Sequence, residues 1–504
     1  MSDKDKALPP HRLEENLDPE DWEATRALGH RMLDDMLDYM KTVAERPAWQ
    51  EVPEQVAARL REPLPRESAD ESQVYEQFQR DVLPYPLGNI HPRFWAWVIG
   101  TGTPMGVLSE LLAATMNPNM GGGVHAPYLV EKQVLEWMRE IFDFPAGSSG
   151  LLVSGGSMAN LVGLTVARHV RAGFDIRKQG LHGSPKPLTV YGSTGMHSSV
   201  QKALELMGMG SDGLRLVETR PDHSIDVEAL ERMLLEDRAA GMQPVCIVGN
   251  AGTVNTGAVD DLDALADICQ QQELWFHVDG AFGAWAAIVP ERAEQMRGMS
   301  RADSLAFDLH KWLYMPIEIG CVLVRDDRQH RDTFSLTPDY LEQTLRGVAA
   351  GGNWFSEYGV QLSRNFRALK AWMSLKTYGI DKYRRLIRQN IEQAVYLGEL
   401  VERHPQLQLM APVSLNIVVF RYLADGLDET APDELMLDEL NKEILLRIQE
   451  RGIAVPSGTR VNERYVIRVA HVNHRTRYSD MDLLVQSVLE IGREIMDAGP
   501  RAIS

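Results

Sequence analysis

The spacing of hydrophobic positions divides the chain into three parts, and the first of them is helical. Residues 18–45 place Leu28, Met32, Met36 and Met40 on one face, which predicts an amphipathic α-helix. A second helix is expected near residues 72–83, after a proline-rich link. A helical arm of this kind has to cover its apolar stripe with another surface, either the rest of the chain or a second subunit.

In the second part, from about residue 100 to 330, short apolar runs alternate with helical patterns. The apolar runs predict buried β-strands at residues 150–153, 188–191, 245–249, 274–278, 304–307 and 320–324. Helical spacing predicts helices between several of them, at residues 157–170, 198–207 and 262–272. This alternation predicts an α/β fold with a mostly parallel sheet that is covered on both faces.

In the third part, a long helix over residues 363–378 is expected to join the sheet to a smaller α+β region. That region has helical patterns at residues 381–403, 433–451 and 479–496, and strand patterns at 414–420, 453–456 and 465–470. We therefore expect an N-terminal helical segment over residues 1–100, a large domain over 101–375 and a small C-terminal domain over 376–504.

Composition and charge limit the classes of molecule that this chain is expected to bind. Its 504 residues are 44% hydrophobic and 24% charged, which is ordinary for a soluble globular protein. The net charge of −19 argues against nucleic acid and anionic membranes as partners, because both attract basic surfaces. The apolar runs are too short to span a membrane, and no signal peptide is visible. The three scattered cysteines show no metal-binding spacing, so we expect no metal site. Their odd number gives no disulfide framework, and together with the absence of a visible signal peptide this predicts a cytoplasmic protein.

Two predicted central strands end in side chains of opposite charge. Residues 303–312, Asp-Ser-Leu-Ala-Phe-Asp-Leu-His-Lys-Trp, place Lys311 just beyond one strand, and Asp279 ends the strand pattern of residues 274–278. Pyridoxal phosphate (PLP) chemistry needs a lysine amine that forms a Schiff base and a carboxylate that keeps the pyridine nitrogen protonated. Lys311 and Asp279 therefore predict a PLP-dependent enzyme.

Further candidate residues follow other predicted strands. Gly156 and Ser157 lie in a Ser-Gly-Gly-Ser turn before a helix, where backbone amides and a hydroxyl can bind phosphate. Taken alone, that turn equally fits a helix cap. His197 can stack on a cofactor ring and Asn250 can contact the cofactor, although an ordinary loop histidine and a plain turn are the alternatives. Tyr340 precedes a glycine-rich stretch expected to be a mobile loop, and a surface tyrosine without a role is the alternative there.

Together these motifs resemble the group II PLP-dependent amino-acid decarboxylases, typified by aromatic-L-amino-acid, tyrosine and glutamate decarboxylases. The resemblance runs in order from about residue 20 to 490, through residues 154–161, 196–199, 250–257, 277–279, 310–313, 340, 364–367 and 473–476. It implies fold type I of the PLP-dependent transferases, with a mostly parallel seven-stranded sheet flanked by helices, an N-terminal helical arm and a small α+β C-terminal domain. It also implies a homodimer in which the N-terminal segment contributes to dimerisation and the active sites lie at the interface.

The resemblance assigns roles to individual positions. Lys311 corresponds to the Schiff-base lysine, and Asp279 to the partner of the pyridine nitrogen. Tyr340 corresponds to the tyrosine that returns a proton to the α-carbon of the substrate, and Arg364 to an arginine near the active-site entrance. The remaining cofactor contacts implied are His197 and Ala281 on the two faces of the ring, Gly156, Ser157, Asp308 and His310 on the phosphate side, and Asn250.

Two departures from the family pattern bear on the site. Asp308 stands where relatives often have asparagine, and because a carboxylate repels phosphate, we expect it to point elsewhere or to meet a cation. Gly121, Gly122 and His125 lie where relatives carry bulky or hydroxylated residues that shape the substrate pocket across the dimer interface. The glycines suggest a roomier or more flexible pocket, and His125 is a candidate to recognise a polar or acidic group.

The predicted function is that of a PLP-dependent carboxy-lyase, which releases carbon dioxide and a primary amine from an L-amino acid. Phe94, Trp95 and Trp97 lie where relatives build one pocket wall, which favours an aromatic substrate such as tyrosine, phenylalanine, tryptophan or DOPA. An acidic or aliphatic substrate (glutamate, aspartate or cysteine sulfinate) is the alternative. A PLP-dependent aldehyde synthase or aminotransferase of the same fold, and a PLP-binding protein without turnover, are further alternatives. Tyrosine at position 340 favours the amine product.

Overall fold

The computed structural model describes residues 16–336, 346–350, 352–424 and 433–498. The chain forms two compact units. One comprises the described residues up to Val43 together with Val52–Pro86, and the other comprises Ala44–Glu51 and the chain from Leu87 onward.

The smaller unit is helical, as its hydrophobic spacing predicts. It contains α1 (Trp22–Lys41), α2 (Glu54–Arg59) and α3 (Glu71–Asp81). The Asp21 side chain caps α1 by accepting hydrogen bonds from two backbone N–H groups of its first turn. The Tyr75 hydroxyl of α3 donates to Asp35 Oδ2 of α1 over 2.8 Å. No residue of α1 is buried, and the apolar stripe formed by Leu28, Met32, Met36 and Met40 is only partly covered.

A seven-stranded sheet forms the centre of the larger unit. Its strands follow the order β1 (Ser149–Val153), β7 (Gly320–Val324), β6 (Ser304–Asp308), β5 (Trp275–Asp279), β4 (Gln243–Asn250), β2 (Leu188–Ser193) and β3 (Leu214–Val217). Strands β2 to β6 pair in parallel, and β7 runs antiparallel to both of its neighbours. The predicted mostly parallel, seven-stranded sheet is therefore confirmed.

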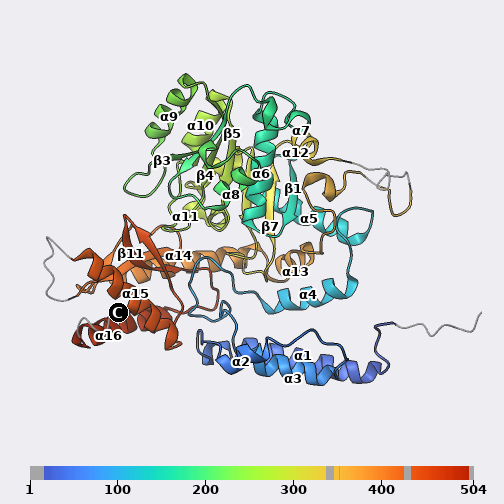
Figure 1. Cartoon of the computed structure of the whole chain (residues 1–504), viewed down its shortest axis with the longest axis vertical. Helices are drawn as coiled ribbons and strands as arrows, with labels where there is room; N and C mark the ends of the chain where they lie inside the picture. Colours follow the sequence, from blue (N-terminus) through green and yellow to red (C-terminus); the bar gives the residue numbers. More distant parts are fainter. Residues whose placement is uncertain (1–15, 337–345, 351, 425–432, 499–504) are drawn as a thin grey trace, which may run out of the picture. The chain divides into compact units, whose positions relative to one another are not determined.

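Helices pack around this sheet (Figure 1). They are α4 (Pro104–Met116), α5 (Ala126–Ile141), α6 (Gly156–Arg171), α7 (Ile176–Gln179), α8 (Ser199–Leu206), α9 (Val227–Ala239), α10 (Leu262–Gln272), α11 (Pro290–Ala293), α12 (Asp327–Phe334) and α13 (Ala368–Tyr378). Every residue of β1, β2, β5, β6 and β7 is buried. Continuous apolar runs form these strands because both faces of the sheet are covered.

The register of the sheet brings four strand ends together. Asn250 at the end of β4 is paired with Asp279 at the end of β5, and Asp279 is paired with Ala306 of β6. At the other side of β6, Asp308 is paired with Gly320, which in turn is paired with Val153 at the end of β1. The loops that leave β1, β4, β5 and β6 therefore start at one edge of the sheet, where α/β proteins bind ligands.

The C-terminal region has a second, antiparallel sheet with its own hydrophobic cluster. Its strands follow the order β10 (Ser457–Val461), β11 (Arg464–Ala470), β9 (Ile417–Tyr422) and β8 (Leu407–Leu409). Helices α14 (Ile380–Glu402), α15 (Glu434–Glu450) and α16 (Tyr478–Ala498) pack against it. The predicted domain boundaries at residues 100 and 375 stay predictions.

Several predicted elements differ from the structure. The strand expected at 453–456 is only a bridge between Val455 and Phe94, and the chain pairs instead from Ser457. The helix expected from residue 363 begins at Ala368, and just before it the backbone N–H of Arg364 donates to the Asn119 side chain. Strand β3, which is partly exposed at the edge of the sheet, was missed.

Among the described residues, no helix has the length and apolar character needed to cross a membrane. In the same part of the chain, no group of three or more histidine, cysteine, aspartate or glutamate side chains is arranged to hold a metal ion. All three cysteines are buried and free.

Candidate cofactor and active site

The turns after β1, β5 and β6 surround a cavity of about 370 Å³. Lys311 lies on its wall together with most of the residues predicted to bind the cofactor, namely Gly156, Ser157, His197, Asp279, Ala281, Asp308 and His310. An adjoining cavity of about 320 Å³ shares Lys311, Asp279, His197 and Ala281, and adds Trp97 and Asn250. The structure thus brings together residues that lie more than 200 positions apart in the sequence.

The turn between β1 and α6 can bind an anion. Ser154–Ser157 line the cavity, and α6 begins at Gly156, so the first N–H groups of this helix have no partner within it. These N–H groups and the Ser157 hydroxyl are suitable donors for a phosphate. A Cβ atom at Gly156 would lie 2.9 Å from Asp308 Oδ2 and 3.2 Å from Ala281 Cβ. A larger residue at position 156 would therefore displace its neighbours.

Asp279 presents a buried negative charge to the cavity. Its side chain accepts a hydrogen bond from Asn160 Nδ2 over 2.8 Å and one from the backbone N–H of Ala281 over 3.1 Å. Donors to a carboxylate stabilise its charged form. The two donors therefore fix the orientation of the carboxylate at the end of β5, where the partner of a pyridinium nitrogen is expected.

Behind Asp279, a chain of buried hydrogen bonds fixes the orientation of Asn160. Because a carboxylate only accepts, the NH2 group of Asn160 faces Asp279 and its Oδ1 faces His277 Nε2 at 2.9 Å. Burial lowers the pKa of His277 to about 4, so the neutral ring carries its proton on Nε2. The Ser304 hydroxyl then donates to His277 Nδ1 over 2.7 Å, and the Trp275 indole donates to Ser304 Oγ over 2.8 Å.

Asn160 also connects Asp279 to His197. Asn160 Nδ2 donates to Ser199 Oγ over 3.0 Å, and Ser199 Oγ lies 2.8 Å from His197 Nδ1. Burial lowers the pKa of His197, against the opposing effect of Asp279. The Ser199 hydroxyl can therefore donate to a neutral ring that has its proton on Nε2. Sequence reasoning gave Asn160 no role, although an asparagine on the buried face of α6 was a usable signal.

Lys311 forms a close ion pair with Asp308. The distance from Lys311 Nζ to Asp308 Oδ2 is 2.9 Å, and the carboxylate is almost fully buried. His310 lies nearby, with Nδ1 3.8 Å from Asp308 Oδ1, but burial lowers its pKa and favours the neutral ring. Of the two expectations for Asp308, the structure thus shows the one in which the carboxylate meets a cation.

Asn250 and Trp97 shape the adjoining cavity. Asn250 Nδ2 donates to Asp260 Oδ2 over 2.9 Å and to Ser193 Oγ over 3.2 Å. Trp97 has a positive φ of 50° and leaves about half of its surface exposed. Its backbone carbonyl accepts a 2.7 Å hydrogen bond from Arg468 of β11.

Sequence reasoning missed Arg468, which holds two walls of the adjoining cavity. This buried guanidinium donates to the backbone carbonyls of Trp97, Val254 and Asn255, and burial lowers its pKa to about 10. An arginine inside an otherwise apolar strand was the available signal. Its partners lie more than 200 residues away in the sequence, so they could not be deduced from it.

Arg364 does not lie at the entrance of the cavity, which corrects the sequence-based expectation. Its guanidinium is buried, with Nη2 2.5 Å from Glu131 Oε1 and 2.6 Å from the Leu152 carbonyl. It also donates to the Met120 carbonyl over 3.1 Å. Arg364 therefore ties α5 to β1 inside the core.

Residues of the same chain occupy the space beside Gly121 and Gly122. A Cβ atom at Gly122 would collide with the Trp354 ring, and one at Gly121 with the Leu362 carbonyl. Within the chain, the absent side chains thus make room for Trp354, and the pocket expected across the dimer interface stays a prediction. His125 caps α5 by accepting a hydrogen bond from the Tyr128 backbone. None of these three residues lines the cavities around Lys311 in the described single chain, and Tyr340 lies outside the described residues.

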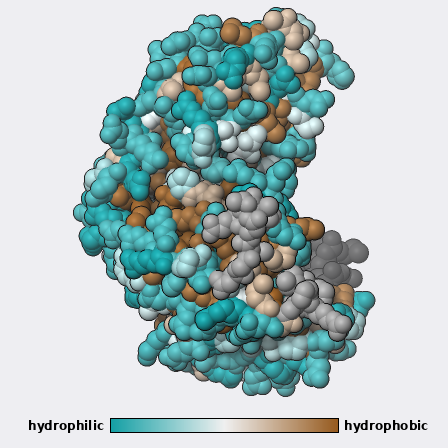
Figure 2. Space-filling model, turned by 90° about the vertical axis from the view of Figure 1, so that its left-hand side faces the viewer, coloured by the Kyte–Doolittle hydropathy of each residue, from teal (hydrophilic) through white to brown (hydrophobic). Residues whose placement is uncertain are grey.

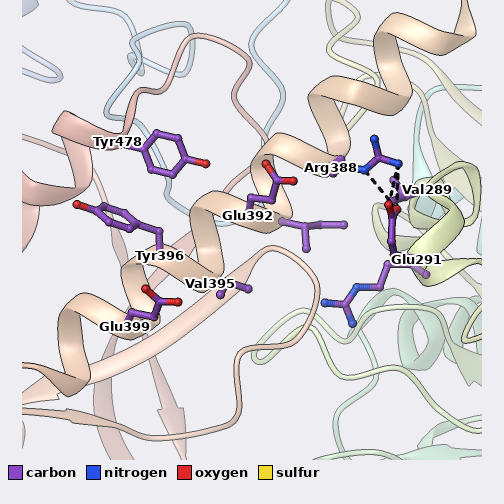
Figure 3. A pocket seen from close by; sticks show the side chains of 10 residues that line it. Val289, Glu291, Arg388, Glu392, Val395, Tyr396, Glu399 and Tyr478 are labelled. Atoms are coloured by element: carbon purple, nitrogen blue, oxygen red, sulfur yellow. Dashed lines mark hydrogen bonds and ion pairs between the residues drawn. The ribbon is translucent and has the colours of Figure 1, made fainter.

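A larger hollow of about 860 Å³ lies elsewhere, along α14 (Figure 3). It contains the Arg388–Glu291 ion pair, with 3.0 Å between the charged atoms, and the side chains of Tyr396 and Tyr478. No residue predicted for the cofactor or the substrate lines it. Size alone therefore does not identify the chemical site, whereas the grouping of Lys311, Asp279 and the Gly156 turn does.

Comparison with known proteins agrees with this grouping. Residues 53–423 match the model of the pyridoxal-dependent decarboxylase conserved domain. The aromatic-L-amino-acid decarboxylase of Bacillus atrophaeus is 33% identical over 481 residues, which are 95% of this chain and 97% of the relative. The phenylacetaldehyde synthase of Petunia hybrida is 28% identical, over 93% of each chain. The crystal structure of Oryza sativa TDC with PLP and tryptamine has a TM-score of 0.87 at 27% identity, over 95% of this chain and 100% of the other.

The residues present fit PLP. The Gly156 turn would hold the phosphate, Asp279 the ring nitrogen and Lys311 the aldehyde carbon. The first N–H groups of α6, which have no partner within the helix, lie at this cavity and fit a phosphate. When bound, PLP would supply a ring that accepts the electron pair released from the substrate α-carbon.

We predict that Asn160→Ala weakens cofactor binding, because Asp279 loses a donor and His277 loses its acceptor. The full-length protein should lose about 1–3 kcal/mol of unfolding free energy. Its affinity for PLP should fall by about tenfold, since one hydrogen bond to the charged carboxylate disappears. Urea unfolding of the cofactor-free protein and equilibrium dialysis of PLP measure the two effects.

Asn441→Ala is the matched control for this prediction. Asn441 is equally buried, but its amide bonds the backbone of Tyr422 and Leu437 near the second sheet. The control variant should lose stability and keep its PLP affinity. Equal loss of PLP affinity in both variants, or unchanged affinity in Asn160→Ala, would contradict the role given to Asn160.

Proposed function

The chain belongs to the pyridoxal-dependent decarboxylase family, and on that premise we propose that it decarboxylates an aromatic L-amino acid to carbon dioxide and a primary amine. The observation that carries the proposal is the grouping of Lys311, Asp279 and the Gly156 turn around one cavity. The name of the Bacillus atrophaeus relative and the tryptamine in the Oryza sativa structure support the aromatic substrate.

The chain's own residues have separate tasks in this reaction. Asp279, stabilised by Asn160, keeps a proton on the ring nitrogen, and this charge stabilises electrons that leave the α-carbon. The first N–H groups of α6 and the Ser157 hydroxyl orient the cofactor through its phosphate. His197, held by Ser199, presents a neutral ring beside Lys311 in both cavities.

The adjoining cavity supports an aromatic side chain on the substrate. Apart from the residues that it shares with the cofactor cavity, its wall is mainly apolar and includes Trp97, Val98, Val254 and Phe282. An apolar wall favours burial of a ring, whereas a second carboxylate would need a cation there. This lining favours an aromatic substrate over glutamate, aspartate or cysteine sulfinate.

The proposal includes a homodimer with active sites at the interface. Helix α4 leaves Val107, Leu111, Leu112 and Met116 exposed, at 37–58% of their surface, and α1 has no buried residue. The face drawn in Figure 2 is mostly hydrophilic but also carries a patch of hydrophobic side chains. Apolar faces of this kind are suited to a second copy of the chain. The net charge of −19 and the free buried cysteines support a cytoplasmic protein that binds neither nucleic acid nor membrane.

An aldehyde synthase of the same fold is the second candidate function. The observation that favours it is the 28% identity to the Petunia hybrida phenylacetaldehyde synthase. Tyrosine at position 340 favours the decarboxylase, by resemblance to enzymes that return a proton to the substrate α-carbon. The two functions differ in product, because one releases an amine and the other releases an aldehyde with ammonia and hydrogen peroxide.

We predict that the PLP-supplemented protein releases carbon dioxide and the matching amine from tyrosine, phenylalanine, tryptophan or DOPA. Lys311→Ala should lose the visible absorbance of the attached cofactor, and its release rate should fall by about a thousandfold or more, because no amine remains to hold the aldehyde. Carbon dioxide and amine are measured over a panel of amino acids. Lys442→Ala, an exposed lysine paired with Glu439, is the control.

Two outcomes would count against this prediction. Release of carbon dioxide only from glutamate, aspartate or cysteine sulfinate would contradict the substrate class. Borohydride trapping of PLP on a residue other than Lys311 would contradict the site itself.

We also predict that Tyr340→Phe redirects the product from amine to aldehyde. Without the phenolic proton, the amine fraction should fall by about tenfold or more, since a positioned proton donor is worth at least that in rate. Chromatography of amine and aldehyde in the same reaction measures the ratio. Tyr396→Phe removes a hydroxyl that donates to Asp482. Tyr396 lies outside both cavities around Lys311, so this variant should leave the ratio unchanged. A Tyr340→Phe variant that still forms only amine would contradict the assigned role.

A further inference from the structure

The position of Asp308 is determined by the backbone segments around it. It is the last residue of β6, and its side chain is 1% exposed. An added Cβ atom at Gly156 would lie 2.9 Å from Asp308 Oδ2, and one at Gly320 would lie 2.6 Å from Oδ1. The carboxylate therefore lies between the phosphate-binding turn and the start of β7, where it has little freedom to move away.

Within the described residues, charge rather than directional hydrogen bonding holds this carboxylate. Neither oxygen of Asp308 has a hydrogen-bond partner of suitable geometry, yet Lys311 Nζ lies 2.9 Å from Oδ2. His310 Nδ1 is 3.8 Å from Oδ1, but it lies closer to the Ile319 carbonyl, at 2.9 Å, and burial favours its neutral form by lowering its pKa. The Lys311 ammonium is therefore the cation that balances Asp308.

Because the carboxylate is buried, the ion pair between Lys311 and Asp308 is hard to separate. A buried carboxylate that loses its cation is strongly destabilised, because little water is available to solvate it. Asp308 thus holds the Lys311 side chain beside it. An asparagine at the same position would offer a similar shape without that charge.

We propose that Asp308 is a positioning residue that holds Lys311 in an ion pair in the cofactor-free protein and thereby slows covalent attachment of PLP. The inference rests on the proposed function, in which Lys311 is the lysine that carries the cofactor. The carboxylate thus lowers the rate of PLP attachment, whereas an uncharged residue at position 308 would not.

The attachment step shows why the charge of the amine matters. The Nζ lone pair of Lys311 attacks the aldehyde carbon of PLP, and the two remaining amine hydrogens leave with the aldehyde oxygen as water, so that a C=N bond forms. An ammonium has no lone pair and must first release its third proton to solvent. Because the amine must also leave its ion pair with Asp308 before it can attack, that pair raises the free energy needed to begin the step.

A different effect of Asp308 on the phosphate has to be separated from this one. Because the carboxylate lies behind the Gly156 turn, its charge would also oppose a bound phosphate. Pyridoxal has the same aldehyde as PLP but no phosphate. An effect through Lys311 is therefore common to both aldehydes, whereas an effect through phosphate appears only with PLP.

The test compares attachment rates in full-length protein stripped of its cofactor. Second-order rate constants for PLP and for pyridoxal are measured near pH 7 from the visible absorbance of the attached aldehyde, and borohydride trapping with peptide mapping identifies the lysine. Asp308→Asn should accelerate attachment of both aldehydes by about tenfold, since the cost of separating a close ion pair with a buried carboxylate lowers the fraction of free amine by a factor of this order or more. Asp308→Ser removes the same charge with a smaller side chain and should accelerate both as well, so the result does not depend on the folding of one variant.

Asp237→Asn is the matched control. Asp237 is also a buried carboxylate, paired with Arg215 and with the Tyr191 hydroxyl outside both cavities. Its loss should reduce stability without changing either attachment rate.

Each remaining outcome overturns the inference. Acceleration with PLP alone would mean that Asp308 acts on the phosphate, and unchanged or slower attachment in the Asp308 variants would mean that it does not restrain Lys311. Should the wild-type protein attach neither aldehyde at Lys311, the proposed function would fail together with the inference. Attachment at Lys311 without the acceleration would overturn the inference alone.

Discussion

The parallel pairing of β4, β5 and β6 is the constraint on which the site depends. Its register places Asn250 beside Asp279 and Asp279 beside Ala306, so the chain that continues to Lys311 starts at the same edge. A slip of one residue would turn Asp279 to the opposite face of the sheet. The burial of these strands on both faces provides the energy that prevents such a slip.

Around this framework, the site balances its charges with little help from solvent. Asp279 and Asp308 are both buried, and each is compensated differently. Asp279 receives hydrogen bonds from Asn160 and from the Ala281 backbone, whereas Asp308 depends on the ammonium of Lys311. A carboxylate stabilised by fixed donors remains available to a cofactor, while one stabilised by the reactive amine competes with the cofactor for that amine. Two acids of the same type can therefore have opposite effects in one cavity.

How far the site could be predicted depended on whether each residue ends a strand or lies within an element. Lys311, Asp279 and the Gly156 turn were predictable, because each follows a continuous apolar run and the ends of such strands converge in an α/β fold. Asn160 and Arg468 were missed, because each lies inside an element that otherwise shows only an apolar pattern. Their importance comes from partners such as Asp279 and Trp97, which no local spacing identifies.

By itself, the amino-acid sequence determined the alternation of strands and helices, the residues at the strand ends and hence the kind of cofactor, because these follow from local hydrophobic spacing and short motifs. Only the tertiary structure decided that Arg364 pairs with Glu131 in the core and that the space beside Gly122 belongs to Trp354. It also decided that Asp308 meets Lys311. Each of these outcomes depends on which distant segments pack together, and that choice is made by the burial of the whole chain rather than by any one stretch of it.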